Sequence, residues 1–185
     1  TAIINFFNFS DGIDGLIASS GFIYFIFIGF IINPIFLVVA SSLLVFLFFN
    51  WSPAKVFMGD VGSTFIGSIV VISALTKVDY ISSFSLILMV CPVLMDPFFC
   101  ILRRLIAKEN IFIAHKSHLY QRLHQNGWKH SKISLIYASA TFASTLSFIM
   151  FDFLYGMVTI CLIFIFGLYL EYFHASPFKS NFNKK

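Results

Sequence analysis

Long apolar runs alternate with short polar segments along most of the chain. The apolar runs cover residues 15–32, 35–49, 64–76, 81–102, 133–150 and 153–173. The longer runs reach the ~20 residues that a helix needs to cross the hydrocarbon core of a bilayer, and the shorter ones fall somewhat below it. A helix also satisfies its backbone hydrogen bonds within one segment, as a bilayer requires. The pattern therefore predicts an all-α, polytopic transmembrane helical bundle with six spans.

The composition fits a membrane protein and excludes a soluble globular domain. Hydrophobic residues make up 59% of the chain, charged residues make up 11%, and 26 of the 185 residues are Phe. A soluble domain could not bury this much apolar surface. The three cysteines lie in apolar runs, at spacings that indicate neither a disulfide nor a zinc site. We expect a lipid bilayer as the surrounding partner and no nucleic acid.

The N-terminal residues do not have the pattern of a secretory signal. Ala2 to Phe9 lacks both a basic region and a small-residue cleavage site. The chain starts at Thr1 without a Met. We therefore expect residues 1–185 to be a single membrane domain from the C-terminal part of a longer protein.

The first polar segment, NFFNFSDGIDGL, places Asn5, Asn8, Asp11 and Asp14 at every third position. The glycines that follow each Asp predict that a helix ends near Asp11. The result is a cluster of amide and carboxylate oxygens at a membrane boundary. A calcium loop of the EF-hand type is not indicated, because the alternating acidic positions and the closing Glu are absent. A polar helix start with capping side chains is the alternative.

The second polar segment, PAKVFMGDVGS, separates two apolar runs. It places Asp60 between two glycines, which allow the backbone and a bound anion to approach closely. This pattern indicates ligand binding or charge handling at a membrane boundary. The alternative is a tight turn in which Asp60 caps a helix that starts near Ser63.

The third polar segment, AHKSHLYQRLHQNGWKHSK, is basic and rich in histidine. On a helical turn His115 and His118 would point the same way, with Arg122 one turn further along. Two imidazoles and a guanidinium suit a phosphate-rich substrate. Two alternatives remain open: a zinc site that adds His124 or His130, and a loop that binds anionic lipid headgroups.

Basic residues predict the orientation of the bundle, because Lys and Arg concentrate on the cytoplasmic side. If the first polar segment is cytoplasmic, all Lys and Arg residues except Lys77 lie on that side. The turns at Asn33-Pro34, Lys77 to Tyr80 and Phe151-Asp152 then face outward. The three polar segments converge at one cytoplasmic mouth.

One carboxylate falls inside an apolar run. Asp96 lies between Pro92 and Pro97, and a charge at such depth requires a partner. Arg103 and Arg104 follow two turns later on roughly the same face, so we expect a structural ion pair with them. We also expect Asp96 to form a hydrogen bond with a backbone group that proline leaves without its helical partner. A role in transport or in lipid contact is the alternative.

Taken in order, NFFNFSDGIDGL, NWSPAKVFMGDVGS and HKSHLYQRL resemble the motifs of the polyprenyl-phosphate N-acetylhexosamine-1-phosphate transferases. This family includes the phospho-MurNAc-pentapeptide translocase. The HKSHLYQ sequence is more similar to the branch that starts O-antigen and related lipid-linked glycans. The resemblance covers nearly the whole chain, except that a further Asp-Asp motif near the N-terminus of the family has no match here.

The resemblance implies a Mg²⁺-dependent enzyme, with Mn²⁺ as a possible substitute. It would transfer an amino sugar 1-phosphate from a UDP-sugar to polyprenyl phosphate and release UMP. It also implies a multi-pass protein of the bacterial inner membrane with its active site on the cytoplasmic face. The alternatives are the peptidoglycan transferase, an inactive scaffold and a transporter. Neither the amino sugar nor the oligomeric state follows from the sequence.

The resemblance also implies roles for individual residues. The implied metal ligands are Asn8 and Asp60. The implied catalytic residues are Asp11, Asp60, His115 and His118. The implied substrate-binding residues are Asn5, Asp14, Lys55, Phe57, Gly59 and Arg122.

Overall fold

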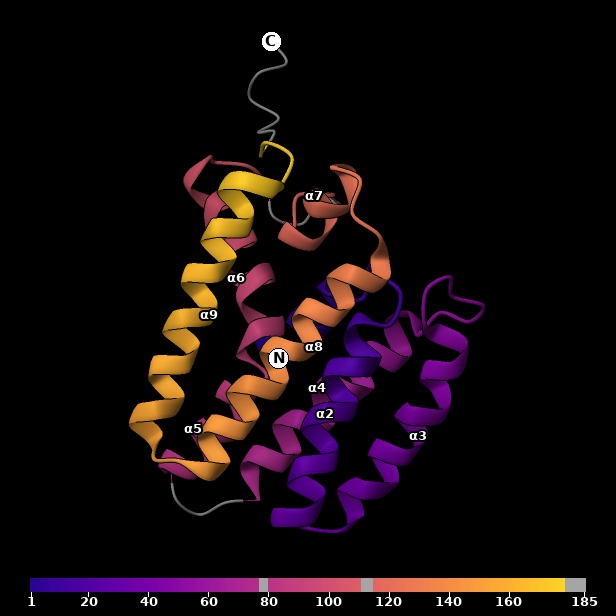
Figure 1. The fold of residues 1–185 in the computed structure, drawn as a ribbon, viewed down its shortest axis with the longest axis vertical. Helices are drawn as coiled ribbons and strands as arrows, with labels where there is room; N and C mark the ends of the chain where they lie inside the picture. Colours follow the sequence, from indigo (N-terminus) through magenta and orange to yellow (C-terminus); the bar gives the residue numbers. More distant parts are fainter. Residues whose placement is uncertain (77–79, 111–114, 179–185) are drawn as a thin grey trace.

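In the computed structural model, residues 1–76, 80–110 and 115–178 are described. These residues form nine α-helices and no strand (Figure 1). The helices are α1 (Ala2–Phe9), α2 (Leu16–Ile31), α3 (Ile35–Asn50), α4 (Gly59–Leu75), α5 (Tyr80–Met89), α6 (Cys91–Ile106), α7 (Leu119–Gln125), α8 (His130–Met150) and α9 (Phe153–His174). The all-α prediction is confirmed.

Each predicted span coincides with a helix or a pair of helices. α8 and α9 are each long and apolar enough to cross a membrane, with 21 and 22 residues. α2, α3 and α4 are apolar but shorter, with 16, 16 and 17 residues. The predicted start of the third span at residue 64 was late, because α4 already begins at Gly59.

The fourth predicted span, residues 81–102, is not one straight helix. It is divided into α5 and α6, whose axes meet at 79° across a break at Val90. Pro92 lies in the first turn of α6, where its missing N–H costs nothing. Pro97 lies inside α6 and removes one hydrogen bond of the helix.

Hydroxyl groups from neighbouring helices bond to the carbonyls around this break. The ring nitrogen of Pro97 cannot donate to the carbonyl of Val93, and the Ser10 hydroxyl donates to that oxygen at 3.1 Å. The Ser144 hydroxyl of α8 donates to the carbonyl of Met89 at 2.6 Å. The expectation that Asp96 would answer the freed group was wrong, since a carboxylate cannot donate to a carbonyl.

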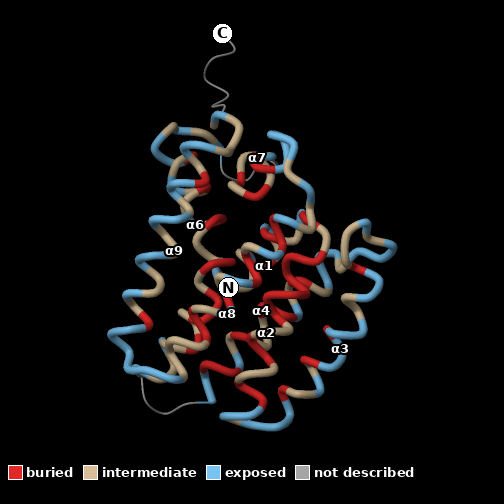
Figure 2. Tube along the Cα trace, viewed as in Figure 1, coloured by how far each residue is buried: buried red, intermediate tan, exposed pale blue. Residues whose placement is uncertain are grey.

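The interior of the bundle lies where α2 packs against α3 and α8, and where α1 packs against α4. Buried positions are most frequent on α2, whereas α3 and α9 have many exposed positions (Figure 2). α1 and α4 approach closely because Gly67 has no side chain. A Cβ at this position would lie 3.0 Å from the Cα of Ile4 and 3.1 Å from the Cβ of Phe7. This contact places the end of α1 beside the start of α4.

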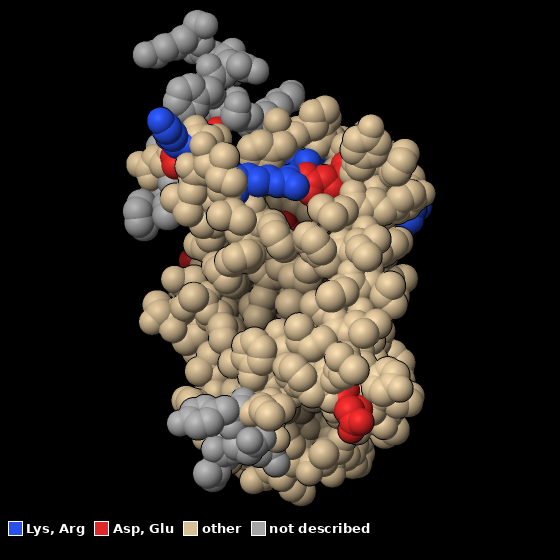
Figure 3. All heavy atoms as spheres, turned by 90° about the vertical axis from the view of Figure 1, so that its left-hand side faces the viewer, with Lys and Arg blue, Asp and Glu red and all other residues tan. Residues whose placement is uncertain are grey.

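The outside of the bundle is apolar, as expected for a surface that faces lipid. Among the residues of α9, only Gly156 and Leu170 are buried, and large side chains such as Leu154 and Leu162 are exposed. Lys and Arg on the face shown in Figure 3 lie toward its upper end, and a broad zone of uncharged residues separates them from an acidic side chain near the lower end. The chain is therefore an integral membrane protein.

The polar segments gather at one end of the bundle. The loop after α1, the loop after α3 and helix α7 lie toward the upper end in Figure 1, whereas the α2–α3 and α8–α9 turns lie at the lower end. The predicted grouping of these segments is confirmed. The predicted outward turn at Lys77 to Asp79 lies outside the described residues.

Candidate active site

Two clusters of polar side chains form the candidate site. The first joins the end of α1 to the first turn of α4. The Ser63 hydroxyl donates a hydrogen bond to the side-chain oxygen of Asn8 at 2.8 Å. Ser63 is fully buried, and Asp60 lies exposed on the same turn of α4. The close packing of α1 on α4 therefore brings two of the predicted oxygen ligands, Asn8 and Asp60, to one place.

Asp11 completes this first cluster. Burial, with a smaller contribution from the nearby charge of Asp60, raises the pKa of its carboxyl group to about 7, although a hydrogen bond from the Gly59 backbone acts in the opposite direction. A bound cation would stabilise the ionised form of a carboxyl group whose pKa is raised in this way. Carboxylate and amide oxygens are also the ligands that Mg²⁺ prefers, so the side chains of Asn8, Asp11 and Asp60 fit this ion.

The backbone beside this cluster is open to a ligand. Gly59 has a φ of +66°, a conformation that side chains disfavour, and no atom lies within 4 Å of a Cβ built there. Phe57 is 73% exposed, and Lys55 is exposed as well. Asn5 is exposed on α1, one turn before Asn8. The predicted substrate-binding residues Asn5, Lys55, Phe57 and Gly59 are thus all accessible.

Asp14 makes contacts to two other parts of the chain. Its carboxylate accepts a hydrogen bond from the backbone N–H of Ala54 at 3.2 Å and lies 3.1 Å from Nδ1 of His130. The Ser134 hydroxyl donates to its backbone carbonyl at 2.6 Å. Asp14 therefore connects the loop after α1 to the loop after α3 and to α8. Its substrate-binding role stays a prediction, and these contacts give His130 a partner that the sequence did not suggest.

The second cluster is built around Asp96 on α6. Its carboxylate accepts hydrogen bonds from the backbone N–H groups of Leu119 at 2.7 Å and Tyr120 at 3.1 Å, and from the Tyr137 hydroxyl at 2.7 Å. Nδ1 of His118 lies 3.6 Å away. Asp96 thus caps the N-terminus of α7, where a negative charge is stabilising.

The predicted ion pair of Asp96 with Arg103 and Arg104 was wrong. Arg103 pairs with Glu171 on α9 through both carboxylate oxygens, and Arg104 lies 3.3 Å from Glu109. The two arginines follow the helix to the membrane boundary, where these glutamates are available. Asp96 instead accepts hydrogen bonds from the backbone N–H groups at the start of α7.

Arg122 is enclosed by protein groups. It is only 4% exposed, and its guanidinium donates to the carbonyls of Ser117 and Ser176, both at 3.1 Å, and to Glu171 at 2.7 Å. Its predicted contact with phosphate stays a prediction, and these bonds argue against it.

His115 and His118 lie together, although not on a helical turn. His118 is the N-cap of α7 with an extended backbone, and its ring centroid lies 5.0 Å from that of His115. His118 is buried and stacks on Tyr120 at 5.5 Å, whereas His115 is half-buried. Burial, followed by the charges of His118 and Arg104, lowers the pKa of His115 to about 4, so its ring is neutral at pH 7.

Tyr120 connects the two clusters. Its hydroxyl donates a hydrogen bond to the carbonyl of Phe9 at 2.7 Å. A Cβ at Gly12 would lie 2.5 Å from this hydroxyl, so the loop after α1 passes directly against the ring. The oxygen-rich cluster and the histidine cluster are therefore parts of one polar region.

The comparisons with known proteins agree with the motifs. Residues 1–78 match the sequence model described as "Glycosyl transferase family 4". Residues 1–78 therefore have the sequence pattern of this family. The glycosyl transferase family 4 match extends from α1 through α4, and so includes the cluster of Asn8, Asp11 and Asp60.

Curated relatives extend the similarity beyond the first four helices. The "Probable undecaprenyl-phosphate N-acetylglucosaminyl 1-phosphate transferase" of Bacillus subtilis is 33% identical over 91% of this chain and 51% of its own length. The "Decaprenyl-phosphate N-acetylglucosaminephosphotransferase" of Mycobacterium leprae is 32% identical over 73% of this chain and 42% of its own length. The "Phospho-N-acetylmuramoyl-pentapeptide-transferase" of Deinococcus radiodurans is 47% identical over 36% of this chain and 21% of its own length. The chain thus spans about half the length of the first relative and less of the others.

Several residues in the candidate site or packed beside it were not predicted from the sequence. Asn50 bonds to both loops of the first cluster: its side-chain oxygen accepts from the N–H of Gly15 at 3.0 Å, and its amide donates to the carbonyl of Val56 at 2.9 Å. Tyr120 lies inside the HKSHLYQRL motif, so its place in that motif could have identified it. Cys100 and Glu171 lie in apolar helices, and no local pattern distinguishes them.

Proposed function

We propose that the whole protein transfers an amino sugar 1-phosphate from a UDP-sugar to a polyprenyl phosphate and releases UMP. The observation that carries this proposal is the pair of carboxylates, Asp11 and Asp60, beside the amide of Asn8 and the open backbone at Gly59. Such a donor set suits a divalent cation and phosphate oxygens. The names of the relatives, which act on undecaprenyl and decaprenyl phosphate, supply the substrate class.

The side chains of Asn8, Asp11 and Asp60 would hold Mg²⁺, or Mn²⁺ in its place. When bound, the ion neutralises charge on the diphosphate, which is the main requirement of phosphoryl transfer. Asp11 must lose its proton to contribute a ligand, and its raised pKa places that step near neutral pH. The acceptor is a phosphate monoester, which is already largely ionised at pH 7 and needs no strong base.

The remaining accessible residues would orient the donor. The exposed ring of Phe57 offers a stacking surface for uracil, and Lys55 offers a charge on the same loop. The neutral ring of His115 would donate a hydrogen bond to phosphate rather than supply a full charge. We place this region at the cytoplasmic face of a bacterial inner membrane, because the basic residues gather at the same end of the bundle.

The product would begin a lipid-linked glycan of the cell surface, such as O-antigen. Peptidoglycan synthesis is the second candidate, because the chain is 47% identical to the Deinococcus enzyme over 66 aligned residues. UMP release by the purified full-length protein separates the two. UDP-N-acetylglucosamine should support turnover, and UDP-MurNAc-pentapeptide should not; the reverse result would assign the protein to peptidoglycan synthesis.

The variant Asp60→Asn tests the role of the carboxylates in that assay. It removes one charge but keeps the shape of the side chain, so turnover should be abolished while the folded protein stays intact. Asp152→Asn, at the opposite end of the bundle, is the matched control and should retain full activity. Wild-type turnover by Asp60→Asn at saturating Mg²⁺ would exclude Asp60 from the site. Absence of turnover with any UDP-sugar would favour a scaffold instead of an enzyme.

A further inference from the structure

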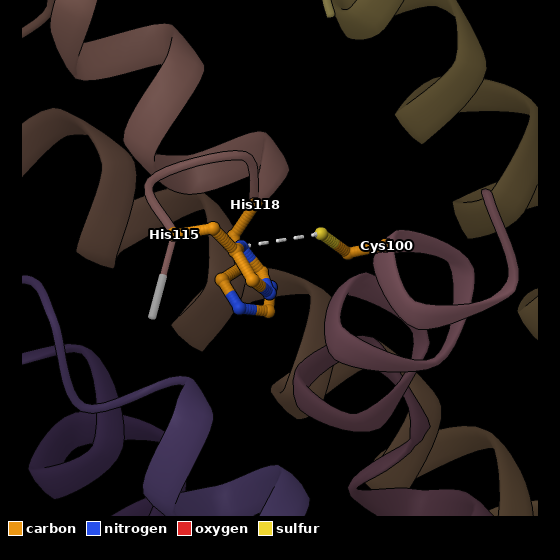
Figure 4. A group of neighbouring side chains, drawn as sticks. All are labelled: Cys100, His115 and His118. Carbon is orange, nitrogen blue, oxygen red and sulfur yellow. Dashed lines mark hydrogen bonds between the residues drawn. The ribbon is translucent and has the colours of Figure 1, made fainter. Parts of the chain in front are cut away.

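Cys100 lies beside the two histidines of the second cluster. The sulfur of Cys100 and one ring nitrogen each from His115 and His118 lie within 4.8 Å of one another. The contact between Sγ of Cys100 and Nδ1 of His115 measures 3.9 Å. Figure 4 shows the rings of His115 and His118 side by side, with the sulfur of Cys100 facing them from α6.

This spacing is close to that of a tetrahedral metal site. Zn²⁺ binds a thiolate at ~2.3 Å and an imidazole at ~2.0 Å, which places neighbouring ligand atoms roughly 3.5 Å apart. Small side-chain rotations that move Sγ of Cys100 and Nδ1 of His115 by a few tenths of an ångström bring the two atoms to that separation. A thiolate with two imidazoles also selects zinc over magnesium, which prefers oxygen.

The surroundings of His118 support a bound cation. Its Nδ1 is buried without a hydrogen-bond partner, and the carboxylate of Asp96 lies 3.6 Å from this atom. A carboxylate beside a metal-ligating imidazole fixes the ring and raises its basicity. The positive charges of the neighbouring arginines are paired, Arg103 with Glu171 and Arg104 with Glu109, so they oppose a bound cation less strongly.

We propose that Cys100, His115 and His118 form a Zn²⁺ site distinct from the oxygen-rich cluster at Asp11 and Asp60. Three protein ligands leave a fourth position for water or a phosphate oxygen. An ion would reach the site from the side of the half-buried His115, since Cys100 and His118 are buried. A bound zinc ion would engage both histidines and so prevent their contact with the diphosphate. This inhibitory effect, unlike the binding itself, rests on the proposed function.

Co²⁺ binding to the full-length protein in detergent tests the site directly. Cobalt bound to a thiolate absorbs strongly in the near ultraviolet, and Zn²⁺ should displace it. Cys100→Ser should abolish this absorption and weaken Zn²⁺ binding by about tenfold or more, since even changes outside the ligand shell cause losses of that size. Cys161→Ser is the matched control, because that thiol is exposed on α9 and should be replaceable without effect. No thiolate absorption in the wild type, or unchanged absorption in Cys100→Ser, would overturn the proposal.

UMP release gives a second measurement. Zn²⁺ added over excess Mg²⁺ should inhibit the wild type, and Cys100→Ser should resist that inhibition with its basal turnover intact. If the cobalt signal depends on Cys100 but bound Zn²⁺ leaves turnover unchanged, the result supports the metal site and contradicts the proposed contact of the two histidines with phosphate. Failure of the two proposals is therefore distinguishable.

Discussion

The hydroxyl of Tyr120 donates a hydrogen bond to the carbonyl oxygen of Phe9, 111 residues earlier in the chain, at a distance of 2.7 Å. Phe9 ends α1, and the next residues lead directly to Asp11. Tyr120 follows His118 and stacks on its ring. One hydrogen bond thus sets the position of the oxygen-rich cluster relative to the histidine cluster.

Tyr120→Phe removes this bond and keeps the ring. The free energy of unfolding should fall by about 1 kcal/mol, the usual net value of one hydrogen bond. Turnover should fall more than this loss of stability explains, because the loop that carries Asp11 is no longer fixed. Thermal unfolding in detergent and UMP release measure the two effects. Tyr155→Phe, on the exposed surface of α9, should change neither. Wild-type turnover by Tyr120→Phe would show that the clusters act independently.

The stability of the metal-free protein should depend on pH through Asp11. Its pKa in the folded protein is raised from 3.8 to about 7, so the folded state holds a proton that the unfolded state has released across this range. The contribution of Asp11 to stability is therefore greatest below about pH 4 and is lost as the pH rises to about 7. Saturating Mg²⁺ should reverse this loss, because the ion binds the ionised carboxylate.

Thermal midpoints at several pH values, with and without Mg²⁺, measure this dependence. Asp60→Asn should make the profile somewhat less steep, because it removes the neighbouring charge that adds to the effect of burial on the pKa of Asp11. A metal-free profile that is equally steep in the variant and in the wild type would contradict the coupling of the two carboxylates.

His115→Ala should lower turnover by on the order of 10²-fold, as expected for a group that stabilises charge in the transition state. The cost to folding should be small because the ring is half-buried. The lowered pKa of about 4 keeps this ring neutral, so its contribution should not vary between pH 6 and pH 8. His124→Ala, exposed on α7, is the control. If the loop only attracts anionic lipid, both variants should turn over at the wild-type rate in detergent.

Glu171→Gln should destabilise the protein through two arginines at once. Glu171 accepts hydrogen bonds from Arg103 and from the buried Arg122. Removing its charge leaves a buried guanidinium without its counter-ion, at a cost on the order of 2 kcal/mol after discounting for the partial exposure of Glu171. Chemical unfolding measures this loss. Asp152→Asn, which has no such partners among the described ion pairs, should be neutral.

The orientation of the bundle can be tested by labelling single cysteines. Asn33→Cys, in the turn between α2 and α3, should react with a membrane-impermeant reagent added to intact cells. Lys55→Cys, at the opposite end of the bundle, should react only after the cells are permeabilised. Both positions are exposed, so a difference between them reports their side of the membrane. The reverse pattern would invert the predicted topology.

The positions of the helices followed from the sequence, because apolar runs and polar breaks are local properties. The 79° bend between α5 and α6 did not, although Pro92 and Pro97 were visible. A proline removes a hydrogen bond wherever it stands, but the direction of the bend depends on the neighbouring hydroxyls of Ser10 and Ser144, which come from distant parts of the chain.

The convergence of the three motifs was also predictable, because charge bias placed them on one side. The partners of single side chains were not. We expected Asp96 to bind an arginine of its own helix, yet it caps α7, a different element. The approach of Cys100 to His115 likewise joins two separate parts of the chain and does not follow from spacing within one element.

The break between α5 and α6 has a consequence for the order of membrane insertion. This segment leaves the ribosome before α8, yet Asp96 requires the Tyr137 hydroxyl and the carbonyl of Met89 requires Ser144, both from α8. Unpaired polar groups are costly in lipid, so α5 and α6 on their own form a poor span. We therefore expect the broken segment to settle into the bilayer together with α8, and a nascent chain that stops before residue 130 to insert this segment poorly.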